Sequence, residues 1–131
     1  PELPATTLSD GCYGGMFEGC TSLTIAPELP VAELTDSCYH SMFRDCTSLT
    51  TAPVLPATGL AEGCYWGMFR GCTSLNHITC LATNTSASDC TSNWVDGVSS
   101  TGTFIKHPDM NGWATGVNGI PSGWELKNYE G

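Results

Sequence analysis

The sequence predicts an α/β repeat fold: a short solenoid with parallel strands on one face, short helices on the other, and a C-terminal cap. A 26-residue pattern occurs three times, in residues 1–26, 27–52 and 53–78, and twelve of its positions are identical in all copies. Each copy contains one strand-sized segment and one apolar pattern with helical spacing. A repeat this short cannot bury its own apolar side, so neighbouring copies must stack to form one continuous core.

The strand-sized segments are residues 23–26, 49–52 and 75–78. They stop at Pro27, Pro53 or Thr79. Proline lacks the N–H that a sheet needs, so a strand must end near it. Stacking the three copies therefore predicts a narrow parallel sheet.

The segment before each strand is predicted to be a short helix. In the first copy Cys12, Met16, Phe17 and Cys20 stand at i, i+4, i+5 and i+8, which is one helical face. The same spacing recurs in the other two copies. Glycines in these segments weaken an isolated helix, so packing against the sheet must hold it.

The chain of 131 residues is predicted to form one domain. Residues 1–95 make the solenoid, with a partial fourth repeat at 79–95 where Trp94-Val95 replaces Met-Phe. The period is then lost, and residues 96–131 are predicted to cap the last repeat as a hairpin or irregular strands. The N-terminal end shows no such cap. We expect a longer array or a partner chain to cover that end, or end-to-end self-association through it.

Six of the eight cysteines recur at two fixed phases of the repeat. Equivalent residues in stacked strands lie about 4.8 Å apart, slightly beyond the usual Cβ separation of a disulfide. Two ladders of free thiols in the core are therefore expected, with disulfides between repeats as the alternative. Cys80 and Cys90 differ in context, and a local disulfide between them would indicate an oxidising compartment.

Composition excludes several classes of function. Four Lys and Arg stand against thirteen Asp and Glu, giving a net charge of −9, so neither nucleic acid nor an anionic membrane is an expected partner. Apolar runs are far shorter than a membrane span requires. No C-x-x-C pair occurs, and no histidine stands at a repeating phase beside a second ligand. Neither a metal, a cofactor nor an enzymatic site is expected.

Positions that vary among otherwise constant repeats are the candidate binding surface. On the predicted strands these are Ile25, Thr51 and His77, with Asn76 beside them, and on the predicted helices Trp66 is a second candidate. Solenoids bind through extended surfaces in which outward side chains vary on a fixed scaffold. The alternative is that these are neutral surface positions.

The pattern Met16-Phe17-x-x-Cys20-Thr21-Ser22-Leu23, followed by Leu29-Pro30, resembles the leucine-rich repeats of the BspA-like family. The version with Leu-Pro, Cys-Tyr and Met-Phe is similar to surface proteins of gut Bacteroides, as is the tail with Cys90, Trp94 and Trp124. The resemblance implies a leucine-rich-repeat solenoid on a bacterial cell surface, or secreted, with a role in adhesion. These 131 residues themselves show no signal sequence.

The sequence therefore predicts a non-catalytic module that recognises a protein or a glycan. The alternative is a structural spacer within a longer surface array. A binding module should expose a contiguous row of varied side chains on one face, whereas a spacer should expose only threonine and serine there.

Overall fold

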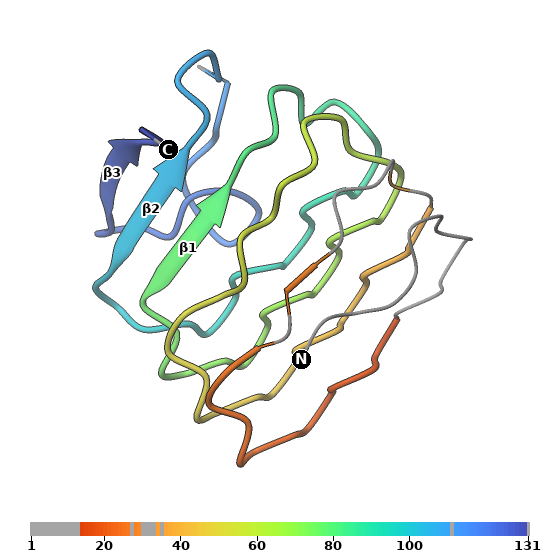
Figure 1. Cartoon of the computed structure of the whole chain (residues 1–131), viewed down its shortest axis with the longest axis vertical. Coiled ribbons are helices and arrows are strands. Elements are labelled where there is room, and N and C mark those ends of the chain that lie inside the picture. The colour runs from red at the N-terminus through yellow and green to blue at the C-terminus, as the bar shows by residue number, and fades with distance from the viewer. Residues whose placement is uncertain (1–13, 27, 30–33, 35, 111, 131) are drawn as a thin grey trace.

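The computed structural model describes residues 14–26, 28–29, 34, 36–110 and 112–130. In this part of the chain the backbone winds into stacked coils (Figure 1). The N–H of Tyr39 donates to the carbonyl of Cys64 at 3.0 Å, and the N–H of Tyr65 to that of Cys90 at 2.9 Å. One side of the stack carries three strands: β1 (His77–Cys80), β2 (Thr103–Lys106) and β3 (Glu125–Asn128).

The predicted helices are wrong, because the described part of the chain contains none. The segments that should be helical are runs of consecutive turns, at residues 14–19, 36–45, 62–71 and 88–97. We call these the first to fourth turn segments, and together the turn ladder. Each contains left-handed residues spaced four apart, such as Ser37, Ser41 and Asp45 with φ of 56°, 53° and 62°. An α-helix cannot contain them, since all its residues are right-handed.

Hydrogen bonding in the turn ladder alternates from residue to residue. The N–H groups of Tyr39, Ser41 and Phe43 donate to carbonyls of the next coil, at 3.0, 2.7 and 3.0 Å. The N–H groups of the residues between them donate three residues back, as Met42 does to the carbonyl of Tyr39. Every second N–H thus joins two coils and the others close the turns, which satisfies a buried backbone without helix or strand.

The sheet also differs from the prediction. β1 is the one predicted strand that forms among the described residues, and it starts two residues late. In the second copy, Thr51 makes only an isolated bridge to His77. The second and third copies differ at the position that follows the strand-sized segment. Pro53 stands there in the second copy and has no N–H to donate, whereas Thr79 stands there in the third copy and has one. The strand can therefore continue to Cys80.

The tail adds parallel strands to the solenoid in place of the expected hairpin or irregular strands. β2 pairs with β1 with Thr103 opposite His77, and β3 pairs with β2 with Glu125 opposite Thr103. All pairings are parallel, in the order β1-β2-β3. The predicted solenoid of helices and strands is therefore wrong, and the described residues form coils of turns with short parallel strands that continue into the tail.

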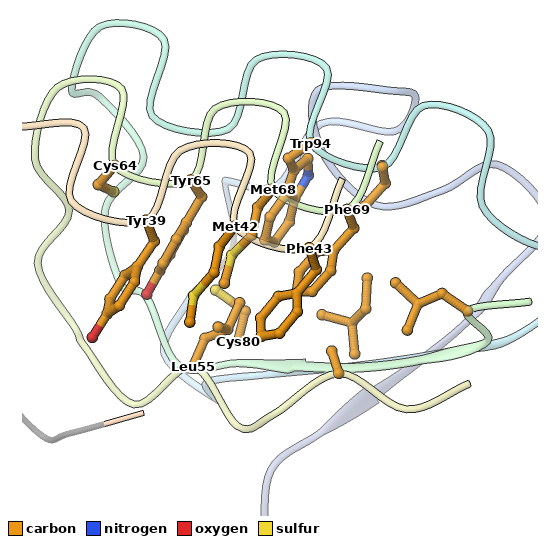
Figure 2. Close-up of a cluster of buried hydrophobic side chains, with 14 of the residues drawn as sticks. Tyr39, Met42, Phe43, Leu55, Cys64, Tyr65, Met68, Phe69, Cys80 and Trp94 are labelled. Carbon is orange, nitrogen blue, oxygen red and sulfur yellow. The ribbon is translucent and has the colours of Figure 1, made fainter. Parts of the chain in front are cut away.

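The core lies between the strand side and the turn ladder, and rows of stacked aromatic side chains run through it. The ring of Phe43 stacks on Phe17 and on Phe69, with centroids 5.6 and 5.8 Å apart and planes within 3°. Tyr39, Tyr65 and Trp94 form a second row (Figure 2). Leu55 and Cys80 reach the same core from the strand side.

The tail is attached to this core through tryptophans. Trp94 stacks on Trp113 at 5.6 Å, and its Nε1 donates to the carbonyl of Gly119 at 2.8 Å. Trp124 is buried and its Nε1 donates to the carbonyl of Ser99. The indoles of Trp94 and Trp124 thus bury their rings while each pairs its one polar atom.

Candidate functional site

A groove lies between the first two coils on the side that carries the strands. It has a volume of about 350 Å³ and is lined by two short segments, residues 24–26 and 50–53. Two of the predicted binding residues, Ile25 and Thr51, line it together. Ile25 is 75% exposed, the most exposed large apolar side chain in the described part of the chain.

The groove exists because the coils separate at this point. No hydrogen bond joins residues 24–26 to residues 50–52. The next pair of coils is closed, since the N–H of Asn76 donates to Thr50 and the N–H of Ala52 donates to His77, both at 2.9 Å. The first coil is held to the second mainly by the turn ladder and the phenylalanine stack, which leaves its strand side open.

The groove is uncharged and mixed in polarity. Thr24, Thr50 and Thr51 bring hydroxyl groups, while Ile25, Ala26, Ala52 and Pro53 bring apolar surface. Hydroxyls beside apolar walls suit a neutral ligand that combines hydrogen-bonding groups with apolar surface. The groove walls carry no charged side chain that would repel a charged ligand, although the whole chain has a net charge of −9.

The structure separates the other predicted residues from this groove. His77 is half-buried in β1 and Asn76 is exposed beside it, both one coil further along and outside the groove lining. Trp66 belongs to the third turn segment and is 48% exposed, with its ring 6.3 Å from that of His40. The row of variable residues on the strand side therefore runs over three coils, and the groove at residues 24–26 and 50–53 is lined by the first two.

The sequence missed a second hollow, of about 190 Å³, between the fourth turn segment and the tail. Val95, Val98, Val117 and Pro121 contribute its apolar walls. Residues 112–122 carry none of the constant residues of the repeat, so nothing in the sequence pattern places Val117 beside Val95.

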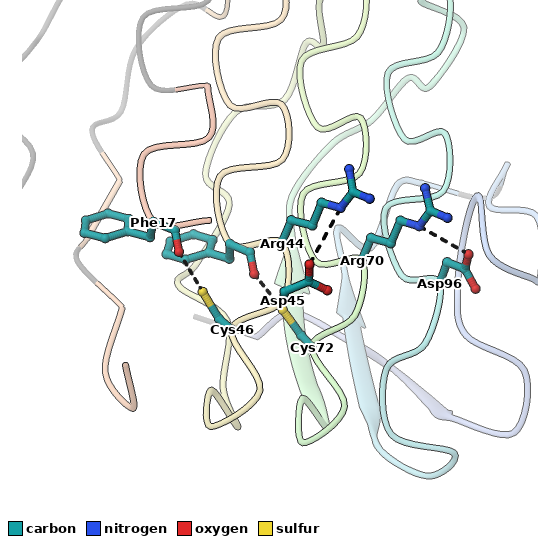
Figure 3. A network of polar contacts seen from close by, with 8 residues as sticks. Phe17, Arg44, Asp45, Cys46, Arg70, Cys72 and Asp96 are labelled. Atoms are coloured by element: carbon teal, nitrogen blue, oxygen red, sulfur yellow. Dashed lines mark hydrogen bonds and ion pairs between the residues drawn. The ribbon is translucent and has the colours of Figure 1, made fainter. Parts of the chain in front are cut away.

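All but one of the described cysteines are buried in the core. Cys46, Cys64 and Cys72 are buried free thiols and Cys38 is also buried, whereas Cys20 is free and exposed; Cys12 lies outside the described residues. The Sγ of Cys46 donates to the carbonyl of Phe17 at 3.1 Å, and that of Cys72 to Phe43 at 2.9 Å (Figure 3). Each thiol thus pairs with the preceding coil and not with another sulfur.

The structure contains no bond between Cys80 and Cys90, which are both buried free thiols. Burial raises the pKa of Cys80 to about 12 and also raises the pKa of Cys90. A cysteine nucleophile needs a lowered pKa. The pKa of Cys46 is raised to about 11 and that of Cys72 to about 12, by burial in each case. These thiols are protonated at neutral pH and serve as small apolar groups.

Charged side chains lie outside this core. Arg70 faces Asp96 across neighbouring coils at 3.7 Å, and Arg44 lies 4.0 Å from Asp45 (Figure 3). All four are substantially exposed, so these pairs add little to stability.

The described residues contain neither a cluster of metal ligands nor a helix that could span a membrane. No three His, Cys, Asp or Glu side chains there are grouped so that they could hold a metal ion. No helix in that part of the chain is long and apolar enough to cross a membrane. Comparison with protein-family models, characterised proteins and solved structures found no match for the chain.

Proposed function

We propose that this protein is a non-catalytic binding module that recognises a protein or a glycan through the groove at residues 24–26 and 50–53. The observation that carries the proposal is the groove itself, which is lined by Ile25 and Thr51. These side chains differ between repeats whose core positions are constant. A fixed scaffold with a varied, hollowed surface is the usual arrangement for binding in solenoid proteins.

The side chain of Ile25 supports binding over a purely structural role. Exposing three-quarters of an isoleucine leaves apolar surface in water. A structural spacer has no need of an exposed isoleucine, since the second repeat folds with threonine at the same phase. Burial of Ile25 against a ligand would supply binding free energy, with the threonine hydroxyls orienting polar groups of the ligand.

We also propose that the module works at a bacterial cell surface or as a secreted protein. The resemblance to BspA-like repeats supports a bacterial cell-surface or secreted protein that takes part in adhesion. The alternative is a structural spacer within a longer surface array, which the same repeats would also suit.

Binding to a glycan array and to immobilised mucosal glycoproteins tests the proposal. We expect the labelled protein to bind a defined ligand, and Ile25→Asp to weaken binding by about tenfold or more, because it places a charge in the apolar part of the groove. Ile25 is largely exposed, so this change should leave folding intact.

Leu126→Asp is the matched control, since Leu126 is a 48% exposed aliphatic residue in β3, outside the groove. It should bind as the unmodified protein does. Equal binding by the two variants would refute the groove as the site. Absence of any ligand in both assays would favour the spacer.

A further inference from the structure

The turn ladder carries outward side chains at every fourth residue. In the third turn segment Glu62, Trp66 and Arg70 each precede a left-handed glycine, and all three are exposed. The residues between them, at 63–65 and 67–69, are buried. In the fourth turn segment the same phases are exposed or half-buried and are held by Ser88, Ser92 and Asp96. We call these six residues the outer face.

Trp66 is the one large apolar side chain of the outer face, and it is 48% exposed. One side of its ring faces His40 of the preceding coil, with the centroids 6.3 Å apart and the planes inclined by 31°. On the following coil the same phase is Ser92, whose carbonyl accepts the N–H of Gly67 at 2.9 Å. A serine is too small to cover an indole, so the side of the ring away from His40 stays accessible.

Polar and charged side chains flank this indole along both coils. Four residues after it, Nε of Arg70 lies 3.7 Å from Oδ2 of Asp96, and both side chains are about half exposed (Figure 3). Four residues before it stand Glu62 and, on the next coil, Ser88, both exposed. The hydroxyl of Ser92 donates to Oδ1 of an exposed aspartate at 2.9 Å. The ring is therefore bordered by a guanidinium, carboxylates and hydroxyls.

This combination matches the chemistry of a sugar ring. A pyranose has a face of C–H groups, which packs on an indole, and a rim of hydroxyls. Each hydroxyl both donates and accepts, so it pairs equally with a carboxylate or with a guanidinium. A partner with a purely apolar surface fits poorly, because it would bury Glu62, Arg70 and Asp96 without pairing them.

The charge of the outer face selects a neutral ligand. Its two carboxylates, Glu62 and Asp96, outnumber its one guanidinium, Arg70, and the whole chain has a net charge of −9. An anionic ligand is therefore repelled both locally and by the field of the whole molecule. A neutral saccharide escapes this repulsion and still uses both signs of charge as hydrogen-bonding groups.

We propose that the outer face is a binding site for neutral saccharides, in which a pyranose ring stacks on the indole of Trp66 above Ser92. Its hydroxyls donate to the carboxylates of Glu62 and Asp96 and accept from Arg70. The platform contacts one face of the sugar and leaves the other free, so the sugar can belong to a long chain. The core separates this site from the groove at residues 24–26 and 50–53, and the two sites are independent.

Electrophoresis in native gels that contain mannan, dextran, β-glucan or galactan tests the proposal. We expect at least one of these neutral polysaccharides to retard the protein, and Trp66→Ala to weaken that binding by about tenfold or more. Trp66 is half exposed, so this variant should keep its urea midpoint. Arg70→Met removes donors from an exposed position and should weaken binding about fivefold. The same polysaccharide should shift the tryptophan emission to shorter wavelength, and this shift should be lost in Trp66→Ala.

Tyr129→Ala is the matched control, because Tyr129 is an exposed aromatic residue outside the outer face. It should be retarded as the unmodified protein is, and so should the groove variant Ile25→Asp. Failure of all four neutral polysaccharides to retard the protein overturns the proposal, as does equal retardation of Trp66→Ala and the unmodified protein. Retardation by polygalacturonate alone overturns the neutral class of ligand. Binding that is lost in Ile25→Asp and kept in Trp66→Ala places the saccharide in the groove instead.

Discussion

At the scale of single residues, the conformation of every fourth position determines the fold. Gly63, Gly67 and Gly71 have φ of 62°, 61° and 80° in the third turn segment. Ser37, Ser41 and Asp45 occupy the same phases in the second. Left-handed backbone costs about 1–2 kcal/mol for a residue with a Cβ, so glycine is the least strained choice at these positions.

Gly67→Ala tests this requirement. Alanine there must adopt a φ near 61° with its Cβ 3.2 Å from the hydroxyl of Ser41. We expect the free energy of unfolding, measured in urea, to fall by about 1–2 kcal/mol. Gly59→Ala is the control, since Gly59 has no positive φ and a Cβ there meets nothing within 4 Å. A loss as large at Gly59 as at Gly67 would contradict the role given to the left-handed turn.

These residues also show what the sequence could have predicted. Repetition, stacking and the constant apolar phases are readable from residues such as Phe17, Phe43 and Phe69. Their spacing does not distinguish a helix of 3.6 residues per turn from turns with a period of four. The signal that does so is the row of Gly, Ser, Asp or Asn at every fourth position, as in Asp89, Asn93 and Gly97.

At the scale of elements, the phenylalanine stack joins the turn ladder to the core. Phe43 is completely buried between Phe17 and Phe69, while Phe17 ends the described stack and is half-buried. The same side chain, phenylalanine, is thus fully buried at position 43 and half-buried at position 17. The effects of replacing it at the two positions can therefore be compared.

Phe43→Ala should lower the free energy of unfolding by about 3–5 kcal/mol, the usual cost of removing a buried ring. Phe17→Ala should cost clearly less, because water already reaches part of that ring. Urea denaturation of both variants, followed by tryptophan fluorescence, makes the comparison. Equal losses would mean that the first coil is packed as tightly as the second.

The candidate site could be predicted only in part at this scale. Variation between repeats singled out Ile25 and Thr51, and the structure places both in the lining of one groove. It could not show that the hollow ends before Asn76, because that depends on the hydrogen bond between Asn76 and Thr50. The parallel tail was unpredictable for a related reason: β2 and β3 share no repeat motif with β1.

At the scale of the whole molecule, Asn118 closes the solenoid by accepting the N–H of Asn93. Asn118→Ala removes that acceptor and should lower the free energy of unfolding by about 1 kcal/mol. Asn118→Asp keeps an acceptor oxygen and should retain most of the stability. Asn128→Ala, an exposed asparagine in β3, should have little effect. If the alanine and aspartate variants at 118 were equally destabilised, the side-chain acceptor would not be what closes this end.

The buried thiols make the stability of the whole molecule depend on alkaline pH. Burial raises the pKa of Cys46 from 9.0 to about 11, and the pKa values of Cys72 and Cys80 from 9.0 to about 12. The unfolded chain therefore releases these protons at lower pH than the folded protein. Their stabilising contribution is complete below pH 9 and is lost as the pH rises from 9 towards 12.

We therefore expect the urea midpoint, measured under reducing conditions, to fall steadily between pH 9 and pH 11. Burial also raises the pKa of Tyr65, and its hydroxyl adds to the same trend. Cys80→Ala removes one fully buried thiol and should make the fall shallower, whereas removal of the exposed Cys20 by Cys20→Ala should leave the slope unchanged. A midpoint that stays constant or rises over this range would show that the core thiols are not held in their protonated form by burial.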